Sequence, residues 1–130
     1  MEFYYDIDVT SLIAAPSGIT TVTIPASVIS IDYLAFTFAT DLTTVTFAQG
    51  SQLTSIGWYA FFGATSLTDI IIPASVTSIG NYAFEYTTSL TTVTFAQGSQ
   101  LTSIGVTEFA YATSLTNIII PASVTCYDVI

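Results

Sequence analysis

The sequence contains no lysine, arginine or histidine. Its nine charged residues are all acidic, so the net charge is -9, and charged residues make up only 7% of the chain. Without basic side chains the protein cannot neutralise phosphate groups, which excludes nucleic acid as a direct partner. Anionic membrane surfaces repel the chain for the same reason. The missing residue types also exclude catalysis by histidine and Schiff-base chemistry by lysine.

Long apolar runs are also missing, although the mean hydropathy is +0.73. A membrane-spanning helix needs roughly 20 consecutive apolar residues, whereas runs such as Trp58–Ala64 and Ile118–Ala122 are far shorter. We therefore expect no membrane insertion. Residues Met1–Asp6 lack a basic start, so we also expect no signal peptide in this chain. The single cysteine, Cys126, cannot form an internal disulfide.

What the sequence does contain is a repeat. Residues 42–57 and 90–105 both read LTTVTFAQGSQLTSIG, at an offset of 48 residues. Each 48-residue period holds two related units of 23 and 25 residues, because one unit has a turn two residues longer than the other. Such a period predicts a solenoid. We assign residues 1–18 to an N-terminal cap-like segment and residues 19–130 to the solenoid, with the last unit incomplete.

Aligned units share apolar positions, as in the column Val22, Val45, Ile70, Val93 and Ile118 and in the phenylalanine column Phe36, Phe61, Phe84 and Phe109. We predict that stacked units bury these side chains together. Each unit opens with a β-branched, alternating segment typical of a strand. Gly57, Gly80 and Gly105 share a later column, which we interpret as a sharp bend because glycine tolerates positive φ. The stretch after it, such as 81–86, is long enough for one or two helical turns.

Residues 67–90, LTDIIIPASVTSIGNYAFEYTTSL, resemble the BspA-like leucine-rich repeat. The resemblance implies a right-handed solenoid with a parallel β-sheet on one face and short helices or turns on the other. It also implies a surface or secreted protein that binds other proteins without catalysis, so we expect an extracellular or cell-surface location. Two departures from the family pattern are the absence of basic residues and Glu108, which occupies a column of alanines.

We find no chemistry that would indicate an enzyme. Cys126 has no histidine to activate it and occupies a serine column, which favours a structural thiol. Asp6 and Asp8 lack the spaced acids and glycine of a calcium loop. We therefore predict no catalytic residues, no metal and no cofactor. Glu108 either marks a locally opened repeat, which we favour, or is a buried carboxyl whose pKa burial raises.

Strand alternation points every second residue of the opening segments outward. The resulting grid is a candidate binding surface: Thr21, Thr23, Thr44, Thr46, Asp69, Ile71, Thr92, Thr94, Asn117 and Ile119. Its Thr-x-Thr ranks resemble ice-binding β-solenoids, but threonine also simply favours exposed strands. On the opposite side we expect the aromatic residues to pack between turns and in part to remain exposed: Trp58, Tyr59, Phe62, Tyr82, Tyr86 and Tyr111.

The unit that begins at Leu115 stops early, so we expect an unpaired strand edge there. The apolar residues that would form a self-association end are Leu115, Ile118, Ile120, Val124, Tyr127 and Ile130. Head-to-tail contacts that do not close on themselves generate filaments. We therefore rank first a non-enzymatic solenoid whose partner is itself, assembling into extracellular filaments. The alternatives are an adhesin fragment that binds another protein and an ice-binding solenoid.

Overall fold

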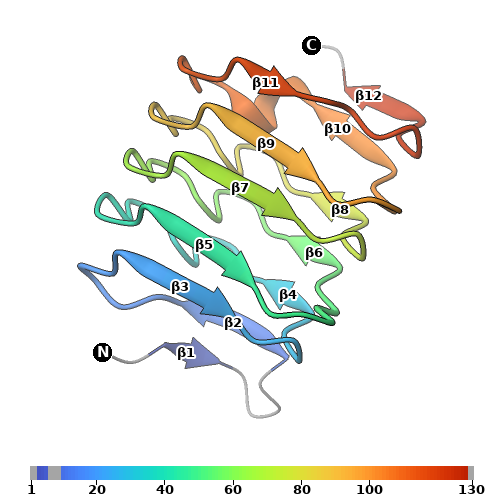
Figure 1. Cartoon of the computed structure of the whole chain (residues 1–130). Helices are drawn as coiled ribbons and strands as arrows, with labels where there is room; N and C mark the ends of the chain where they lie inside the picture. The colour runs from blue at the N-terminus through green and yellow to red at the C-terminus, as the bar shows by residue number, and fades with distance from the viewer. Residues whose placement is uncertain (1–2, 6–9, 129–130) are drawn as a thin grey trace.

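A computed structural model of the chain is a solenoid of stacked repeats (Figure 1). It describes residues 3–5 and 10–128, without the side chains of residues 4, 5, 106, 127 and 128. Two parallel sheets run along the stack, one on each of two sides, and a column of tight turns forms the third. This arrangement confirms the predicted repeat solenoid, although helices are almost absent.

The first sheet is built from the segments that open the repeats. Its strand order is β11-β9-β7-β5-β3. All neighbours in it are parallel, and Val22 lies opposite Val45 while Ile70 lies opposite Val93. The repeats therefore stack in the register that the sequence columns predict. The strands are β3 (Thr21–Ile24), β5 (Thr44–Phe47), β7 (Asp69–Ile72), β9 (Thr92–Phe95) and β11 (Asn117–Ile118).

The second sheet contains the shorter strand of each repeat. Its order is β1-β2-β4-β6-β8, and the pair β10-β12 follows along the same side (Figure 1). These neighbours are parallel except for β1, which runs antiparallel to β2 and places Tyr5 opposite Leu12. The strands are β1 (Tyr4–Tyr5), β2 (Ser11–Ala14), β4 (Ser30–Ile31), β6 (Ser55–Ile56), β8 (Ser78–Ile79), β10 (Ser103–Gly105) and β12 (Cys126–Asp128).

The N-terminal segment divides into two parts. β2 already follows the repeat, since Leu12 pairs in register with Ile31 and is fully buried. β1 reverses direction and covers the outer edge of β2. A capping role for this segment remains a prediction. Asp6, Asp8 and Ile130 lie outside the described residues.

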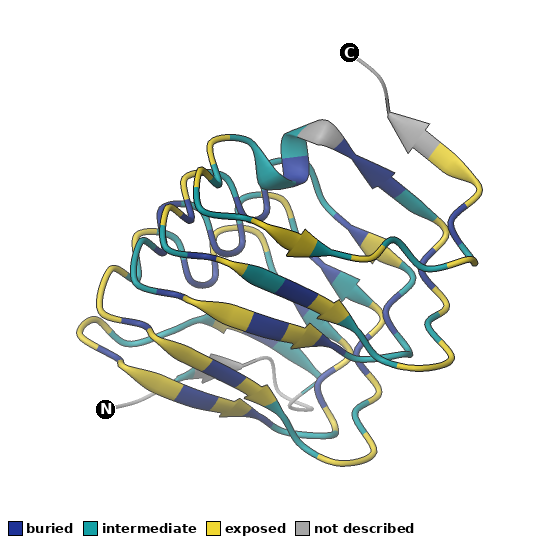
Figure 2. Ribbon diagram, turned by 45° about the horizontal axis from the view of Figure 1, so that its top comes forward, coloured by how far each residue is buried: buried dark blue, intermediate teal, exposed yellow. Residues whose placement is uncertain are grey.

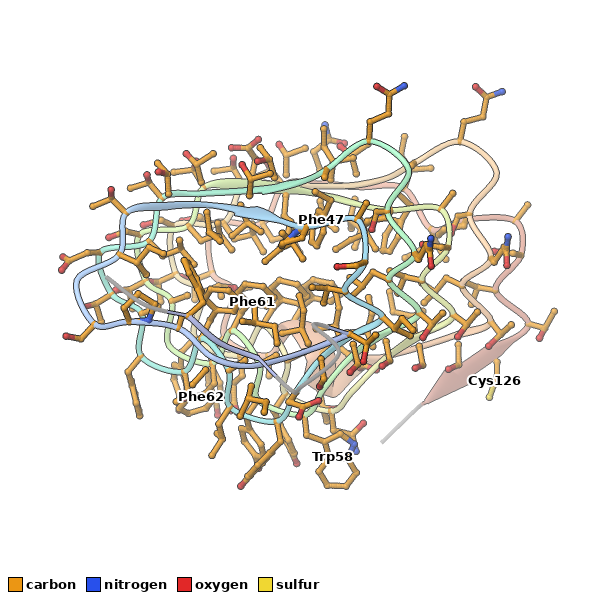
Figure 3. The ribbon with its side chains drawn as sticks, turned by 90° about the horizontal axis from the view of Figure 1, so that it is seen from below. Phe47, Trp58, Phe61, Phe62 and Cys126 are labelled. Atoms are coloured by element: carbon orange, nitrogen blue, oxygen red, sulfur yellow. The ribbon has the colours of Figure 1, made fainter. Side chains whose placement is uncertain are left out.

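The core lies between the two sheets and the turns. The column Val22, Val45, Ile70 and Val93 is buried as predicted, and Ile118 is half-buried. Phe36, Phe61 and Phe84 are buried, and with Phe109 their rings stack at centroid spacings of 4.9, 5.1 and 5.3 Å. Phe61 lies in the middle of the cross-section in Figure 3. One repeat could not exclude water from such a ring, whereas neighbouring repeats cover both of its faces.

The predicted helical turns at 81–86 are wrong. Tyr82 and Tyr86 have φ of 61° and 60°, values that interrupt a right-handed helix. The amide N–H of Phe84 instead donates to the carbonyl oxygen of Glu108 in the next repeat, at 2.8 Å. Bonds between neighbouring repeats thus replace bonds within a helix. Among the described residues the single helical element is the 3₁₀ helix η1 (Val106–Phe109).

The interpretation of the glycine column as a sharp bend with positive φ is wrong, since the turn begins only at the residue after Gly57 and Gly80, and Gly105 belongs to β10. Gly57 and Gly80 lie outside the positive-φ region, and Gly105 has φ of -121°. A Cβ atom added at Gly57 would lie 2.8 Å from the backbone nitrogen of Tyr33. Gly57 and Gly80 are therefore required to be glycine because adjacent repeats approach closely there. The positive φ angles fall two residues later, as at Tyr59 with 57°.

Candidate functional site: a duplicated groove on the first sheet

The outward side chains of the first sheet form one continuous surface, which we call the β3–β11 face. It consists of Thr21, Thr23, Thr44, Thr46, Asp69, Ile71, Thr92, Thr94, Asn117 and Ile119. All are exposed except Thr92, which is half-buried, and they alternate with buried or half-buried neighbours along the strands (Figure 2). The exposure of this predicted surface is confirmed; its role in binding remains a prediction.

Two isoleucines are the large apolar side chains exposed on the β3–β11 face. Ile71 and Ile119 are 59% and 78% exposed, respectively. They occupy equivalent positions of repeats that are 48 residues apart. Large apolar side chains with this exposure supply surface that a partner can bury. They also interrupt the threonine ranks on which the ice-binding hypothesis depends, and that hypothesis remains a prediction.

Several threonine hydroxyls on the face and beside it hydrogen-bond to the protein itself. The Oγ1 atoms of Thr23 and Thr46 lie 2.9 Å apart on adjacent strands. At the start of a strand segment, the Thr43 hydroxyl donates to the carbonyl oxygen of Thr20 in the preceding repeat, at 3.1 Å. Thr91 repeats this bond to Thr68 at the same distance. These bonds use some of the hydroxyl protons on and beside the face internally.

Two open grooves lie on this face, one for each 48-residue period. The first occupies ≈ 470 Å³ between Thr44–Phe47, the turn at Ala48–Ser51 and the side chains of Asp69, Ile71 and Pro73. The second occupies ≈ 440 Å³ between Thr92–Phe95, the turn at Ala96–Ser99 and the side chains of Asn117, Ile119 and Pro121. The two grooves therefore have equivalent walls.

The alternating turn length explains why a groove recurs at every second repeat. The longer turn after β5 or β9 contains a glycine with positive φ, Gly50 at 79° or Gly98 at 81°. The following strand ends in a shorter turn that begins with proline. A long turn beside a short one leaves a step, and that step bounds the groove. The difference in turn length can be seen in the sequence, but the groove can be found only from the way the repeats stack in three dimensions.

The two grooves differ in one polar residue. Asp69 in the first groove is replaced by Asn117 in the second. Asp69 and Asn117 are both exposed and stand at the start of their strands. The Thr68 hydroxyl donates to Asp69 Oδ1 at 3.0 Å. The first groove therefore carries a negative charge that the second lacks, while the apolar side chains match.

The predicted self-association residues whose side chains are described do not line either groove of the β3–β11 face. Only their sequence neighbours Ile119 and Pro121 line the second groove. Leu115, Ile118 and Ile120 are half-buried and Val124 is buried. The structure does not describe the side chain of Tyr127. The edge of β11 that faces away from β9, like the edge of β3 that faces away from β5, has no neighbouring strand among the described residues.

The remaining acids and the cysteine do not assemble into a catalytic or metal site within the described residues. No group of three potential metal ligands occurs there. Cys126 is exposed at the end of the serine column (Figure 3). Glu108 is buried at 3% exposure, so the interpretation that we favoured, a locally opened repeat, is wrong. No helix among the described residues is long and apolar enough to span a membrane.

The aromatic residues of the turn side pack mostly on each other, as predicted. Tyr59 and Tyr82 stack at 5.1 Å, and Tyr86 and Tyr111 stack at 4.7 Å. Burial raises the pKa of Tyr59, and its neighbours Tyr82, Glu85 and Tyr33 raise it further because each can carry a like charge. Trp58 is different, since more than half of its surface is exposed.

Comparison with known proteins agrees with this architecture. The model of the BspA type leucine-rich repeat region matches residues 14–128 in six copies. The chain belongs to this family. Proteins of this leucine-rich repeat family are non-catalytic as a rule, and the chain is a repeat solenoid of this type. No curated protein sequence matches the chain.

Three solved structures illustrate the similarity. A leucine rich cell surface protein from Faecalibacterium prausnitzii is 38% identical over 83% of this chain, with a TM-score of 0.71. The pneumococcal vaccine antigen PcpA is 31% identical over 91%, with a TM-score of 0.73. A leucine-rich repeat protein from T. pallidum is 25% identical over 97%, with a TM-score of 0.83. The chain spans only 28%, 30% and 60% of these three proteins, respectively.

Proposed function

We propose that this solenoid binds a protein partner across the β3–β11 face, with the two grooves acting as equivalent subsites. The observation that carries the proposal is the duplicated groove, in which Ile71 and Ile119 stand at the same position 48 residues apart. The relatives described as a cell surface protein and a vaccine antigen support an extracellular or cell-surface location.

The spacing of the grooves favours a particular partner conformation. Equivalent groove residues are separated by two strand spacings, about 9.5 Å along the solenoid. A polyproline II segment presents the same side-chain direction every three residues, about 9.3 Å. An extended β-strand repeats its side-chain direction every two residues, about 6.6 Å, and does not match. We therefore propose an extended segment with apolar side chains at every third position.

Selection of peptides against the immobilised chain tests this proposal. Binding peptides from a random displayed library are then assayed against the double variant Ile71→Asp/Ile119→Asp. We expect at least a tenfold loss of affinity, because two subsites on one segment reinforce each other. The matched control is Ile13→Asp, which changes an isoleucine that is 44% exposed on β2 of the second sheet.

The two variants separate the possible outcomes. Peptides that lose binding only with the β3–β11 variant and carry apolar residues at i and i+3 support the proposal. Peptides that bind the double variant normally but fail on Ile13→Asp would place recognition on the second sheet and refute it. Peptides with an i, i+2 pattern would refute the polyproline II geometry alone.

Head-to-tail self-assembly is the second candidate function. It is favoured by the edges of β3 and β11, which belong to the same parallel sheet and could continue it from one copy to the next. In the second sheet the reversed strand β1 prevents a parallel continuation at β2. Negative-stain electron microscopy with light scattering over a concentration series measures it. Regular fibres support filament formation, and a concentration-independent monomer eliminates it.

A further inference from the structure

A separate cavity lies away from the β3–β11 face, and we call it the Trp58 pocket. It occupies ≈ 370 Å³ and is lined in part by Trp58, Asn81, Glu108 and three serines of the second sheet, Ser55, Ser78 and Ser103. Trp58 points away from the ribbon on the side opposite to Phe47 of the first sheet (Figure 3). The pocket is therefore a separate surface from the duplicated groove.

The glycine column positions the indole. Trp58 follows Gly57, and its Cδ1 atom lies 2.5 Å from the position that a Cβ atom would occupy at Gly80. Because Gly80 has no side chain, the indole ring can pack against the backbone of the next repeat at this position. The indole is nevertheless 56% exposed, so part of its surface is open to a ligand.

Glu108 is the acidic residue that lines the same pocket. It belongs to η1 and occupies the column in which Ala35, Ala60 and Ala83 are buried. Its carbonyl oxygen accepts the bond from Phe84 N–H, so its backbone keeps the register of the repeat. The larger side chain is consequently held, 3% exposed, in a column that alanine occupies in the other repeats, and it is one of the residues that line the pocket.

The chemistry of the residues that line the pocket favours a cation as its ligand. Indole is the best aromatic partner for a cation over its face, and a carboxylate in a partly dry pocket attracts positive charge more strongly than one in water. The serine hydroxyls and the Asn81 amide add neutral acceptors. The chain itself has no basic side chain and a net charge of -9, so the cation must come from another molecule, which the overall field attracts.

We infer that the Trp58 pocket binds the guanidinium group of an arginine side chain from a partner protein. Guanidinium is favoured over ammonium because it is planar, stacks on an indole and presents several donors to a carboxylate and neighbouring hydroxyls at once. It is also less strongly hydrated. A neutral sugar could stack on the indole as well, but it would gain nothing from Glu108 or from the net charge.

NMR titration of the ¹⁵N-labelled chain tests this inference, because the sole tryptophan gives a single indole N–H signal. The probes are N-acetyl-arginine methylamide, its lysine counterpart and its citrulline counterpart, which is nearly isosteric with arginine but neutral. We expect a saturable shift with the arginine probe, with a Kd on the order of a few millimolar. The lysine probe should bind more weakly, and the citrulline probe should not saturate.

Two substitutions separate a local effect from the overall charge. Glu108→Gln should raise the Kd of the arginine probe about tenfold, since it removes a charged hydrogen-bond acceptor. Asp41→Asn changes the net charge equally at an exposed residue outside the pocket, and it should raise the Kd less than about twofold. Trp58→Leu, followed through the Gly57 and Gly80 amides, should abolish saturation even if Glu108→Gln proves unfolded by circular dichroism.

Three results would overturn the inference. They are equal binding of the citrulline probe, equal effects of Glu108→Gln and Asp41→Asn, and a saturable indole shift with maltose in place of the arginine probe. The peptide selection on the β3–β11 face is independent of all three, because Ile71 and Ile119 do not line this pocket.

Discussion

The glycine column offers the sharpest test of how the repeats are held together. At Gly57 an added Cβ atom would lie 2.8 Å from Tyr33 N, 2.9 Å from Asp32 C and 2.9 Å from Ile31 O. All three are backbone atoms of the preceding repeat, so no side chain can rotate away. Gly57 N–H also donates to Ile31 O at 2.8 Å, and relief of the contact would stretch this bond. We expect Gly57→Ala to destabilise the fold by about 3 kcal/mol, the upper end for overpacking.

Gly50 is the matched control for this substitution. It has φ of 79°, and a Cβ atom added there would meet nothing within 4 Å. Gly50→Ala should therefore cost only backbone strain, about 1 kcal/mol. Asparagine tolerates positive φ better than alanine, so Gly50→Asn should cost less than Gly50→Ala. At Gly57 the order should reverse, because asparagine is the larger side chain.

Equilibrium unfolding in urea, followed by far-ultraviolet circular dichroism, measures these differences. A loss of about 3 kcal/mol is a large fraction of the 5–15 kcal/mol that stabilises a typical domain. We expect a lower midpoint for Gly57→Ala with an unchanged slope. A Gly57→Ala variant within about 0.5 kcal/mol of wild type, or Gly57→Asn more stable than Gly57→Ala, would refute the close-approach explanation.

Two further predictions concern the phenylalanine stack and a carboxyl on the turn side. Phe84→Ala should cost about 3–5 kcal/mol in the same urea assay, and Phe109→Ala distinctly less, because Phe84 is fully buried between two rings whereas Phe109 is half-buried; equal losses would contradict this. Burial raises the pKa of Glu85 above its ordinary value, so the folded state favours the protonated form. The contribution of the Glu85 carboxyl to the free energy of unfolding is therefore present below its unfolded-state pKa and is lost as the pH rises through its folded-state pKa. Glu85→Gln should consequently be more stable than wild type at pH 7 but not at pH 3.5.

The candidate sites show different degrees of predictability. The β3–β11 face could be listed residue by residue, because alternation along a strand fixes which side chains point outward. The grooves on it could not, since a groove depends on how far one turn projects beyond its neighbour. The Trp58 pocket was even less predictable from the sequence. Trp58 and Glu108 are 50 residues apart in the sequence, and only the stacking of repeats brings them to one cavity.

The sequence by itself determined the solenoid, its period and its buried columns. A repeated unit with apolar residues at fixed positions can exclude water only by stacking on its copies, so Val22, Phe61 and their equivalents had to be inside. Tertiary structure alone decided the conformation of the turn side. There the backbone of Tyr82 adopts a costly positive φ because its neighbours gain hydrogen bonds to the next repeat, and Gly57 is required by the distance to Tyr33. Both depend on contacts between repeats, which no local propensity encodes.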